Sequence, residues 1–341
     1  MKLSIERAAL LKALAHIQSV VERRNTIPIL SNVRLEGCRD RLGLAATDMD
    51  LEVIEWVPAT VTAEGGTTAP AHLLYDIVRK LPEGAEIGLE TGGDAGRMAL
   101  RCGRSRFALP CLPTEDFPVM AEGEFSHEYP LSSEHLRRLI DKTRFAISTE
   151  ETRYYLNGIY LHAVTRDGTG HLCAVATDGH RLARIEIELP AGAAGMPGVI
   201  VPRKAVAELR KLIEDIDGAV QVALSATKVR FAFGAVALTS KLIDGTFPDY
   251  ERVIPKHNDK ILNIEGASFS QAVDRVATIS TEKSRTIKLA LQTGTLVLSA
   301  TSPDSGSATE ELPVTYEGPD IEIGFNSRYV LEMTEIGRAH V

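Results

Sequence analysis

The segment Thr177-Asp178-Gly179-His180-Arg181-Leu182 comes nearest to an acid–base site in this sequence. An aspartate and a histidine two residues apart could act as general base and general acid. However, adjacent strand residues point to opposite faces, and Asp-Gly is typical of a turn. A similar phrase, Ala46-Thr47-Asp48, is followed by Met49-Asp50 without a histidine. We therefore favour a ligand or partner site over a plain turn, and either over catalysis by Asp178 and His180.

No other segment carries a catalytic or cofactor motif. The sequence lacks a GxxxxGK(S/T) phosphate loop, an HExxH zinc motif and a GxSxG nucleophile elbow. The glycine-rich run 92–96 is typical of a hairpin turn. The four cysteines, none with CxxC spacing, are Cys38, Cys102, Cys111 and Cys173. We expect them to be reduced thiols that pack as small apolar residues, and we expect no enzyme, metal or cofactor.

The composition excludes several classes of protein. With 44% hydrophobic and 25% charged residues among 341, the chain is globular and not disordered. A net charge of −8 argues against coating nucleic acid through bulk positive charge, and 5% aromatic residues give little support for a base-stacking platform. The longest charge-free run, 289–303, is too short and polar for a membrane span. Charged residues at the N-terminus exclude a signal peptide, so we expect a cytoplasmic protein.

An internal repeat organises the chain. Ala46-Thr47-Asp48 returns as Ala176-Thr177-Asp178 and, in weaker form, as Ala300-Thr301-Ser302, so the threonine recurs after 130 and then 124 residues. Further landmarks keep this order and similar spacing: Phe117-Pro118 and Phe247-Pro248, then Pro70, Pro202 and Asn326. Such consistent offsets indicate one structural unit present three times.

Each unit has the same predicted order of elements, which is an α+β pattern: a helix, strands, a second helix and a closing hairpin. The predicted first helices are 8–21, 133–145 and 268–279, and the second helices are 70–81, 202–214 and one that begins at Asn326. Pro70 and Pro202 suit a first helical turn. The predicted strands include 29–36, 158–163, 287–292, and 85–90 paired with 97–101. Linkers near 120–129 and 252–258 separate domains at 1–121, 129–251 and 258–341.

The third unit is shorter than the others. By the spacing of the first two units, roughly 31 to 33 further residues would complete it. The hexapeptide Ile336-Gly-Arg-Ala-His-Val341 breaks the helical apolar pattern and resembles a translated sequencing adapter. We expect the sequence after about Glu335 to be an artefact, with a genuine divergent tail as the alternative.

Basic residues gather on the predicted helices. In the second unit, Arg137 and Arg138 lie on the first helix and Arg203 and Lys204 on the second. Solvated helix faces with i,i+4 ion pairs are one interpretation. The other is that the repeated helices face one polyanion while acidic strands face outward.

At the level of whole motifs, the chain resembles the bacterial DNA polymerase III β subunits, the β sliding clamps. The motifs cover all three units and are 26–30 (TIPIL), 81–86 (LPEGAE), 103–107 (GRSRF), 153–158 (RYYLNG), 177–182 (TDGHRL), 201–204 (VPRK), 247–250 (FPDY) and 323–326 (IGFN). The resemblance implies the DNA clamp fold, with three repeated domains that each pack two helices on antiparallel sheet. Two such chains would form a head-to-tail dimeric ring around duplex DNA.

The resemblance implies a non-catalytic processivity subunit that tethers the replicative polymerase during chromosomal replication. The implied partners are double-stranded DNA, a second copy of the chain, the DNA polymerase III α subunit, the clamp loader, and other polymerases and repair proteins with clamp-binding peptides. No membrane partner is implied. The alternative is a conventional, non-topological duplex-DNA-binding protein that grips phosphates, whose affinity would fall steeply with salt.

The resemblance also implies three sets of site residues. To the basic helix residues Arg137, Arg203 and Lys204 it adds Arg24, Tyr154 and Tyr155 as DNA-facing positions. The implied partner-peptide pocket consists of Leu156, Thr177, Gly179, His180, Arg181, Leu182, Pro248, Arg252 and Val253. The implied dimer interface consists of Phe107, Leu109, Thr278 and Ile279.

Overall fold

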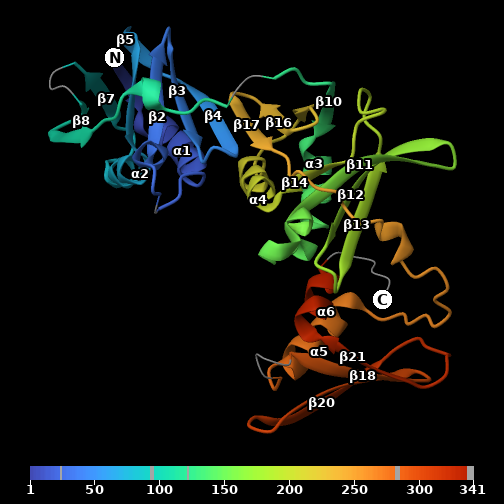
Figure 1. The fold of residues 1–341 in the computed structure, drawn as a ribbon. Coiled ribbons are helices and arrows are strands. Elements are labelled where there is room, and N and C mark those ends of the chain that lie inside the picture. The colour runs from blue at the N-terminus through green and yellow to red at the C-terminus, as the bar shows by residue number, and fades with distance from the viewer. Residues whose placement is uncertain (24, 93–95, 121–122, 281–284, 336–341) are drawn as a thin grey trace. The chain divides into compact units, whose positions relative to one another are not determined.

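The computed structural model describes residues 1–23, 25–92, 96–120, 123–280 and 285–335. The chain divides into two compact units, Met1–Phe247 and Pro248–Val341. The first unit contains the first and second repeats, and the second unit contains the third repeat (Figure 1). Three predicted features fall outside the described residues: Arg24, part of the turn at 92–96, and the tail after Glu335.

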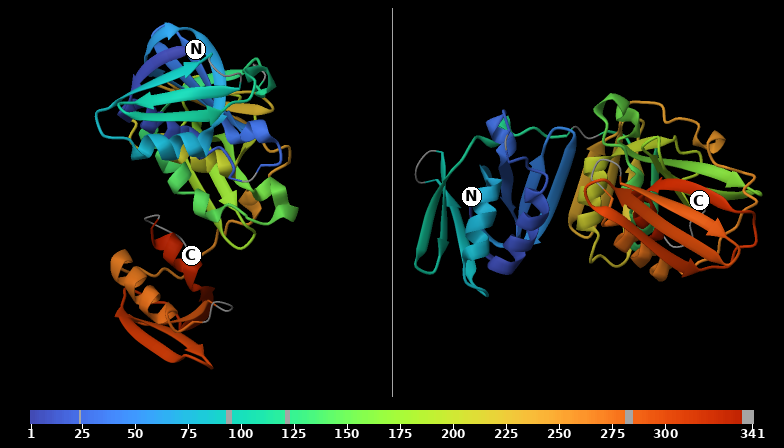
Figure 2. Two further views of the ribbon diagram at one scale, coloured as in Figure 1. Left: turned by 90° about the vertical axis from the view of Figure 1, so that its left-hand side faces the viewer. Right: turned by 90° about the horizontal axis from the view of Figure 1, so that it is seen from below.

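The first repeat packs two helices against its sheets. Helix α1 (Arg7–Gln18) buries Leu10, Ala13, Leu14 and Ile17, which recur at helical spacing. Helix α2 (Ala71–Lys80) lies beside α1 (Figure 2). The other elements are β1 (Lys2–Glu6), η1 (Pro28–Ser31), β2 (Asn32–Cys38), β3 (Arg41–Thr47), β4 (Leu51–Pro58), β5 (Thr60–Ala63), β6 (Gly65–Pro70), β7 (Glu86–Thr91), β8 (Arg97–Cys102), β9 (Ser105–Pro110) and η2 (Thr114–Asp116).

The second repeat has the same order of elements. Helix α3 (Ser133–Asp141) begins after Ser132, whose hydroxyl accepts a hydrogen bond from the His135 N–H, and helix α4 (Arg203–Leu212) begins after Pro202. The other elements are β10 (His127–Ser132), η3 (Arg144–Ala146), η4 (Glu151–Leu156), β11 (Gly158–Arg166), β12 (Thr169–Thr177), β13 (Leu182–Glu188), β14 (Val199–Pro202), β15 (Ala219–Leu224), β16 (Lys228–Phe233) and β17 (Val236–Lys241).

The second unit has its own hydrophobic cluster, which is built on two capped helices and one sheet. The Glu265 carboxylate accepts the N–H groups of Ala267 and Ser268 at the start of α5, and Asn326 caps α6 through the Arg328 N–H. The elements are η5 (Tyr250–Arg252), α5 (Gly266–Ala277), β18 (Thr286–Gln292), β19 (Thr295–Ser302), β20 (Gly306–Pro313), β21 (Ile321–Asn326) and α6 (Ser327–Thr334).

Among the described residues, the strands form four antiparallel sheets. Three of them belong to single repeats, with the orders β5-β1-β7-β8-β9, β13-β12-β11-β14 and β20-β19-β18-β21. The fourth has eight strands in the order β10-β15-β16-β17-β4-β3-β2-β6 and joins the first two repeats. Its joint is the pairing of β17 with β4, from Val236 opposite Glu55 to Ser240 opposite Leu51. The sheet thus continues across the predicted boundary between the first two domains.

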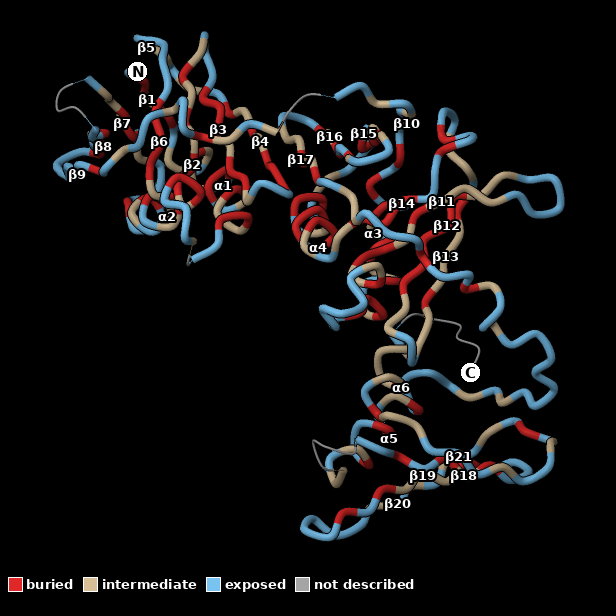
Figure 3. The backbone as a smooth tube through the Cα atoms, in the orientation of Figure 1, coloured by how far each residue is buried: buried red, intermediate tan, exposed pale blue. Residues whose placement is uncertain are grey.

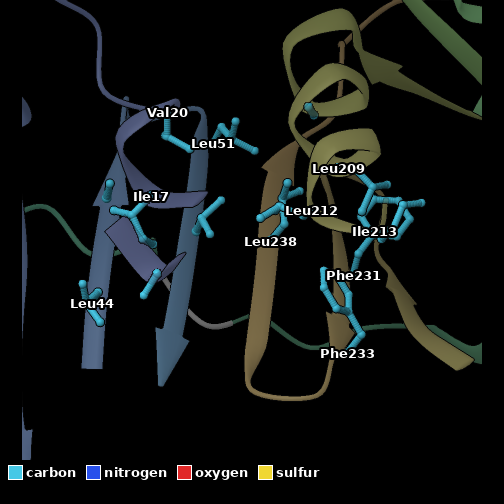
Figure 4. Packing of buried hydrophobic residues seen from close by; sticks show 14 of the residues in the cluster. Ile17, Val20, Leu44, Leu51, Leu209, Leu212, Ile213, Phe231, Phe233 and Leu238 are labelled. Carbon is cyan, nitrogen blue, oxygen red and sulfur yellow. The ribbon is translucent and has the colours of Figure 1, made fainter. Parts of the chain in front are cut away.

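One hydrophobic cluster follows this joint through both repeats. Figure 3 shows buried positions along α1, α4 and the strands beside them. Figure 4 shows Val20 and Leu51 on the side of the first repeat, and Leu212 and Leu238 on the side of the second. We call this joint the seam: the β17–β4 pair with the α1 and α4 side chains that pack beside it.

The six predicted helices are present, but three details of the prediction are wrong. The strand predicted at 29–36 begins only at Asn32, because Pro28–Ser31 form a 3-10 helix in which proline supplies a preset φ. The linker predicted at 120–129 ends earlier, since β10 begins at His127 and buries Tyr129. Pro70 and Pro202 occupy the cap positions before α2 and α4, not their first turns.

Carboxylates are buried near the seam, each with a polar partner. His16 Nδ1 lies 2.8 Å from Glu55 Oε2, and the Ser19 hydroxyl donates a hydrogen bond to Glu208 of α4. The Met120 N–H donates to Glu52 Oε1 at 3.3 Å. Burial raises the pKa of Glu52, and this hydrogen bond and nearby basic side chains only partly oppose the effect.

We therefore expect Glu52→Gln to stabilise the protein at neutral pH. Because the folded-state pKa of Glu52 is raised, the protonated form favours folding, and this contribution is lost as pH rises through that pKa. The variant should raise the thermal midpoint on the order of 2 °C at pH 7 and lose its advantage near pH 4. The thermal midpoints are measured by calorimetry, and Glu83→Gln, which removes an exposed carboxylate, is the control variant. A higher midpoint of Glu52→Gln that persists at pH 4 would contradict this prediction.

Candidate DNA-facing, partner-binding and subunit surfaces

The segment from Thr177 to Leu182 is a turn held by its own side chains. The His180 and Arg181 N–H groups donate to Asp178 Oδ1 at 2.9 and 3.0 Å. The Thr177 hydroxyl donates to the Arg181 carbonyl oxygen at 2.7 Å, and the guanidinium of Arg181 lies 3.1 Å from Asp178 Oδ2. Both Asp178 oxygens are thus engaged by the turn and by Arg181, while His180 is exposed. This arrangement does not form an Asp178–His180 acid–base pair.

The first repeat contains the same turn. The N–H groups of Asp50 and Leu51 donate to Asp48 Oδ1 at 2.9 and 2.7 Å. The residue after each aspartate is left-handed, with φ of 78° at Met49 and 87° at Gly179. The recurring Thr-Asp phrase therefore encodes a backbone shape.

The turn of the second repeat contacts two 3-10 helices. The Arg181 guanidinium lies over the Phe145 ring at 5.2 Å and donates to the Phe145 carbonyl oxygen. A Cβ added to Gly179 would meet Arg153 Nη1 at 2.7 Å, so glycine leaves room for that guanidinium. Leu156, at the end of η4, is buried. The sequence analysis missed Phe145 and Arg153, because no spacing rule connects them to a turn some 30 residues away.

Three predicted pocket residues belong to the second compact unit. Pro248, Arg252 and Val253 are all exposed there. Arg252, the last residue of η5, forms an ion pair at 2.7 Å with Asp249, the residue that precedes η5. The other six predicted pocket residues, from Leu156 to Leu182, belong to the first unit.

Two of the predicted DNA-facing residues, Tyr154 and Arg203, are exposed and lie on neighbouring helices. Tyr154 is exposed and packs edge-on against the half-buried Tyr155, with ring centroids 5.8 Å apart. The Arg203 N–H donates to the Asn157 carbonyl oxygen at 2.9 Å, which brings the start of α4 beside η4. The Arg203 side chain is exposed there.

Two other predicted DNA-facing residues have partners within the protein. Arg137 Nη1 donates to the Ile213 and Ile216 carbonyl oxygens, each at 2.8 Å, and so satisfies groups that follow the C-terminal end of α4. Lys204 forms ion pairs with Asp48 and Glu22 of the first repeat. A basic residue on a helix is therefore not by itself evidence for a DNA contact.

The four predicted interface residues differ in exposure. Phe107 is exposed on β9, whereas Leu109 on the same strand is only 2% exposed and belongs to the core. Thr278 is the exposed C-cap of α5, and Ile279 after it is half-buried. Side-chain contact with a partner is thus open to Phe107, Thr278 and Ile279, while Leu109 offers chiefly its backbone.

Family models of the DNA polymerase III beta subunit match nearly the whole chain. The N-terminal domain matches residues 1–121, the central domain 130–249 and the C-terminal domain 251–336. The chain belongs to the DNA polymerase III beta subunit family. It is a replicative sliding clamp, a non-catalytic class of protein, which sets aside the hypothesis of an enzyme using Asp178 and His180.

Relatives from several bacteria support this assignment. The beta sliding clamp of Caulobacter vibrioides is 58% identical over 333 residues, covering 98% of this chain and 90% of the relative. That of Escherichia coli K12 is 40% identical over 336 residues, covering 98% and 89%. The crystal structure of the C. crescentus beta sliding clamp has a TM-score of 0.97 at 57% identity, covering 99% and 90%. A Bartonella birtlesii sliding clamp bound to griselimycin has a TM-score of 0.96 at 51% identity, covering 99% and 91%.

We expect Gly179→Ala and Gly168→Ala to destabilise the protein by similar amounts. Both glycines have positive φ, 87° and 80°, so alanine at either costs about 1–2 kcal/mol of backbone strain. The new Cβ at Gly179 would meet Arg153 Nη1, the far end of an exposed and flexible side chain that can shift at little cost, and nothing lies within 4 Å at Gly168. Urea unfolding should show losses that agree within about 0.5 kcal/mol. A clearly larger loss in Gly179→Ala would mean that the Arg153 side chain is held in place.

Proposed function

We propose that this chain pairs head to tail with a second copy to close a ring around duplex DNA, and that replication and repair proteins bind its Thr177–Leu182 turn. The observation that carries the ring is the seam. It is a joint between two repeats, made by antiparallel edge strands and a shared hydrophobic cluster. A repeated unit that forms this joint within the chain can form it again between chains.

The strands needed for a second joint lie at the edges of their sheets. By repeat spacing, β9 corresponds to β17 and β20 corresponds to β4. Both β9 and β20 are edge strands of the sheets that the structure describes. An unpaired strand edge offers N–H and carbonyl groups that favour pairing with another chain. We therefore assign the subunit interface to β9 of one copy and β20 of the other.

The register of the seam predicts the contacts of this interface. In the seam, Leu238 lies opposite Val53 and Val236 lies opposite Glu55. The corresponding pairs between subunits are Phe107 with Ala308 and Ser105 with Glu310. When the corresponding helices are aligned from their first residues, α1 with α5 and α2 with α4, Ile279 takes the place of Val20 and Ile77 takes the place of Leu209. The sequence analysis missed Ile77, although the spacing between Pro70 and Pro202 would have found it.

A closed ring explains how an acidic protein can hold DNA. Because a closed ring retains the duplex by topology, it needs no base readout and only a modest positive charge on its inner surface. The acidic outer surface repels DNA. Tyr154 on η4 and Arg203 at the start of α4 are both exposed, and a backbone hydrogen bond from Arg203 to Asn157 joins the two helices, which supports a lining at this place. Arg24 stays a candidate by resemblance alone.

A peptide site on the Thr177–Leu182 turn is supported by its form and by a relative. The turn is held by its own hydrogen bonds, is exposed at Gly179 and His180, and ends at the half-buried Leu182. Small polar groups beside apolar side chains suit capture of short peptides. The relative from B. birtlesii has been crystallised with bound griselimycin. The proposed occupants are peptides of the DNA polymerase III α subunit, the clamp loader, and other polymerases and repair proteins. Pro248, Arg252 and Val253 remain candidates by resemblance.

We also propose that the protein acts in the cytoplasm, where its DNA substrate lies. The four cysteines are free thiols, as suits a reducing compartment. Within the part of the chain that the structure describes, no helix is long and apolar enough to cross a membrane, and no three or more His, Cys, Asp or Glu side chains are arranged to hold a metal ion.

We expect the wild-type protein, loaded on nicked circular DNA by a clamp loader with ATP, to remain bound at 200 mM salt and to be lost when the circle is cut. Ile279→Asp should be monomeric by light scattering at micromolar concentration and should not be retained, because a carboxylate would enter an apolar interface. Ile323→Asp, at an exposed position on β21, is the matched control. Equal retention on circular and linear DNA would favour conventional phosphate binding, and a dimeric Ile279→Asp variant would refute the interface assignment.

We expect His180→Ala to weaken griselimycin binding about 5–10-fold, because the exposed imidazole is lost from the turn while the turn's own hydrogen bonds remain. Isothermal titration calorimetry is the measurement. Met49→Ala, in the corresponding turn of the first repeat, should bind as wild type does. Unchanged affinity in His180→Ala, or equal losses in both variants, would argue against this turn as the site.

A further inference from the structure

Lys204 connects the first and second repeats by charge. Its Nζ lies 2.5 Å from Asp48 Oδ2 and 3.3 Å from Glu22 Oε1. Both carboxylates belong to the first repeat, whereas Lys204 is the second residue of α4. Partial burial acts to lower the pKa of Lys204, but the hydrogen bonds and charges of the two carboxylates outweigh it and hold the pKa above its ordinary value.

The Asp48 carboxylate is held by its own turn as well as by Lys204. Oδ1 accepts the N–H groups of Asp50 and Leu51, which leaves Oδ2 for the lysine. The Asp48 side chain is only 14% exposed, so water competes weakly for it. A charge-assisted contact to a preoriented, mostly buried group is stronger than an ordinary surface ion pair.

The corresponding residues of the other repeats have partners within their own repeats. By the spacing of Pro70, Pro202 and Asn326, the counterparts of Lys204 are His72 and Arg328. The ring nitrogens of His72 lie 3.1 Å from Gln18 Oε1 and 2.9 Å from the Val21 carbonyl oxygen. Arg328 pairs with Glu332 at 2.9 Å on the same helix. Among the described residues at these three positions, Lys204 forms ion pairs that join two repeats, whereas the ion pair of Arg328 stays within its own helix.

We propose that Lys204 is a positioning residue that locks α4 to the first repeat, and that its charge is taken up by Asp48 and Glu22 rather than by DNA phosphates. The neighbouring Arg203 has an exposed side chain and remains the DNA-facing residue at the start of this helix. A lysine that a count of basic residues assigns to DNA thus holds the protein together. Two experiments test this proposal. The measurement of DNA binding rests on the function proposed above, whereas the measurement of stability does not.

The measurement of stability compares Lys204→Met with Arg203→Gln. Loss of the lock should lower the thermal midpoint of Lys204→Met by about 2–4 °C, while Arg203→Gln stays near wild type. Lys204→Arg should restore the midpoint, because arginine keeps the charge and the reach. The double variant Asp48→Asn/Lys204→Met should lose no more than Lys204→Met alone, since the pair is broken once. A Lys204→Met variant with the wild-type thermal midpoint, or a double variant whose midpoint falls further than that of Lys204→Met, would contradict the proposed structural role of Lys204.

The measurement of DNA binding uses fluorescence anisotropy with a linear duplex between 50 and 200 mM salt. Arg203→Gln should reduce the slope of log affinity against log salt by about 0.9, because one phosphate contact is lost. Lys204→Met should leave the slope unchanged. A reduced slope in Lys204→Met would overturn the assignment of its charge. Because a topological ring is expected to hold a linear duplex only weakly, a wild-type protein that does not bind it leaves the proposed function intact, and the stability comparison then decides the structural role of Lys204.

Discussion

The antiparallel pairing of β17 with β4 is the interaction on which the rest of the first unit depends. A sheet edge exposes unpaired N–H and carbonyl groups, and the repeats satisfy two such edges with each other. Once the strands are in register, α1 and α4 lie beside the same joint, and one hydrophobic cluster runs through it. Glu208 and Lys204 are placed by this register, since their partners Ser19 and Asp48 come from the opposite repeat.

The sequence was informative where a local pattern determines structure. Helical periodicity located α1 and α5, and the recurring Thr-Asp phrase located the two equivalent turns. It was uninformative about partners distant in the chain. Strand alternation specifies which face of β4 is buried but not which strand pairs with its edge. The role of Arg137 likewise depends on carbonyl groups some 76 to 79 residues away, which no spacing rule predicts.

The two Thr-Asp turns show how repeats diverge while their backbone stays the same. Each turn places one residue in the left-handed region, where a residue other than glycine is disfavoured by about 1–2 kcal/mol. At Met49 the hydrogen bonds of the turn, in which the side chains of Thr47 and Asp48 accept backbone N–H groups, offset this cost. At Gly179 the absence of a side chain admits the Arg153 guanidinium and leaves His180 exposed. One backbone shape thus serves the seam in the first repeat and an exposed surface in the second.

The structural use of basic residues is consistent with a ring that slides. A protein that grips DNA through phosphates gains affinity with each lysine or arginine it places against the duplex. A ring that retains DNA by topology gains little from additional contacts, and strong ion pairs would slow its movement. Lys204 and Arg137 can therefore be committed to Asp48, Glu22 and the end of α4 without loss of the proposed function. Such a ring does require that the seam within each chain and the proposed interface between chains stay paired.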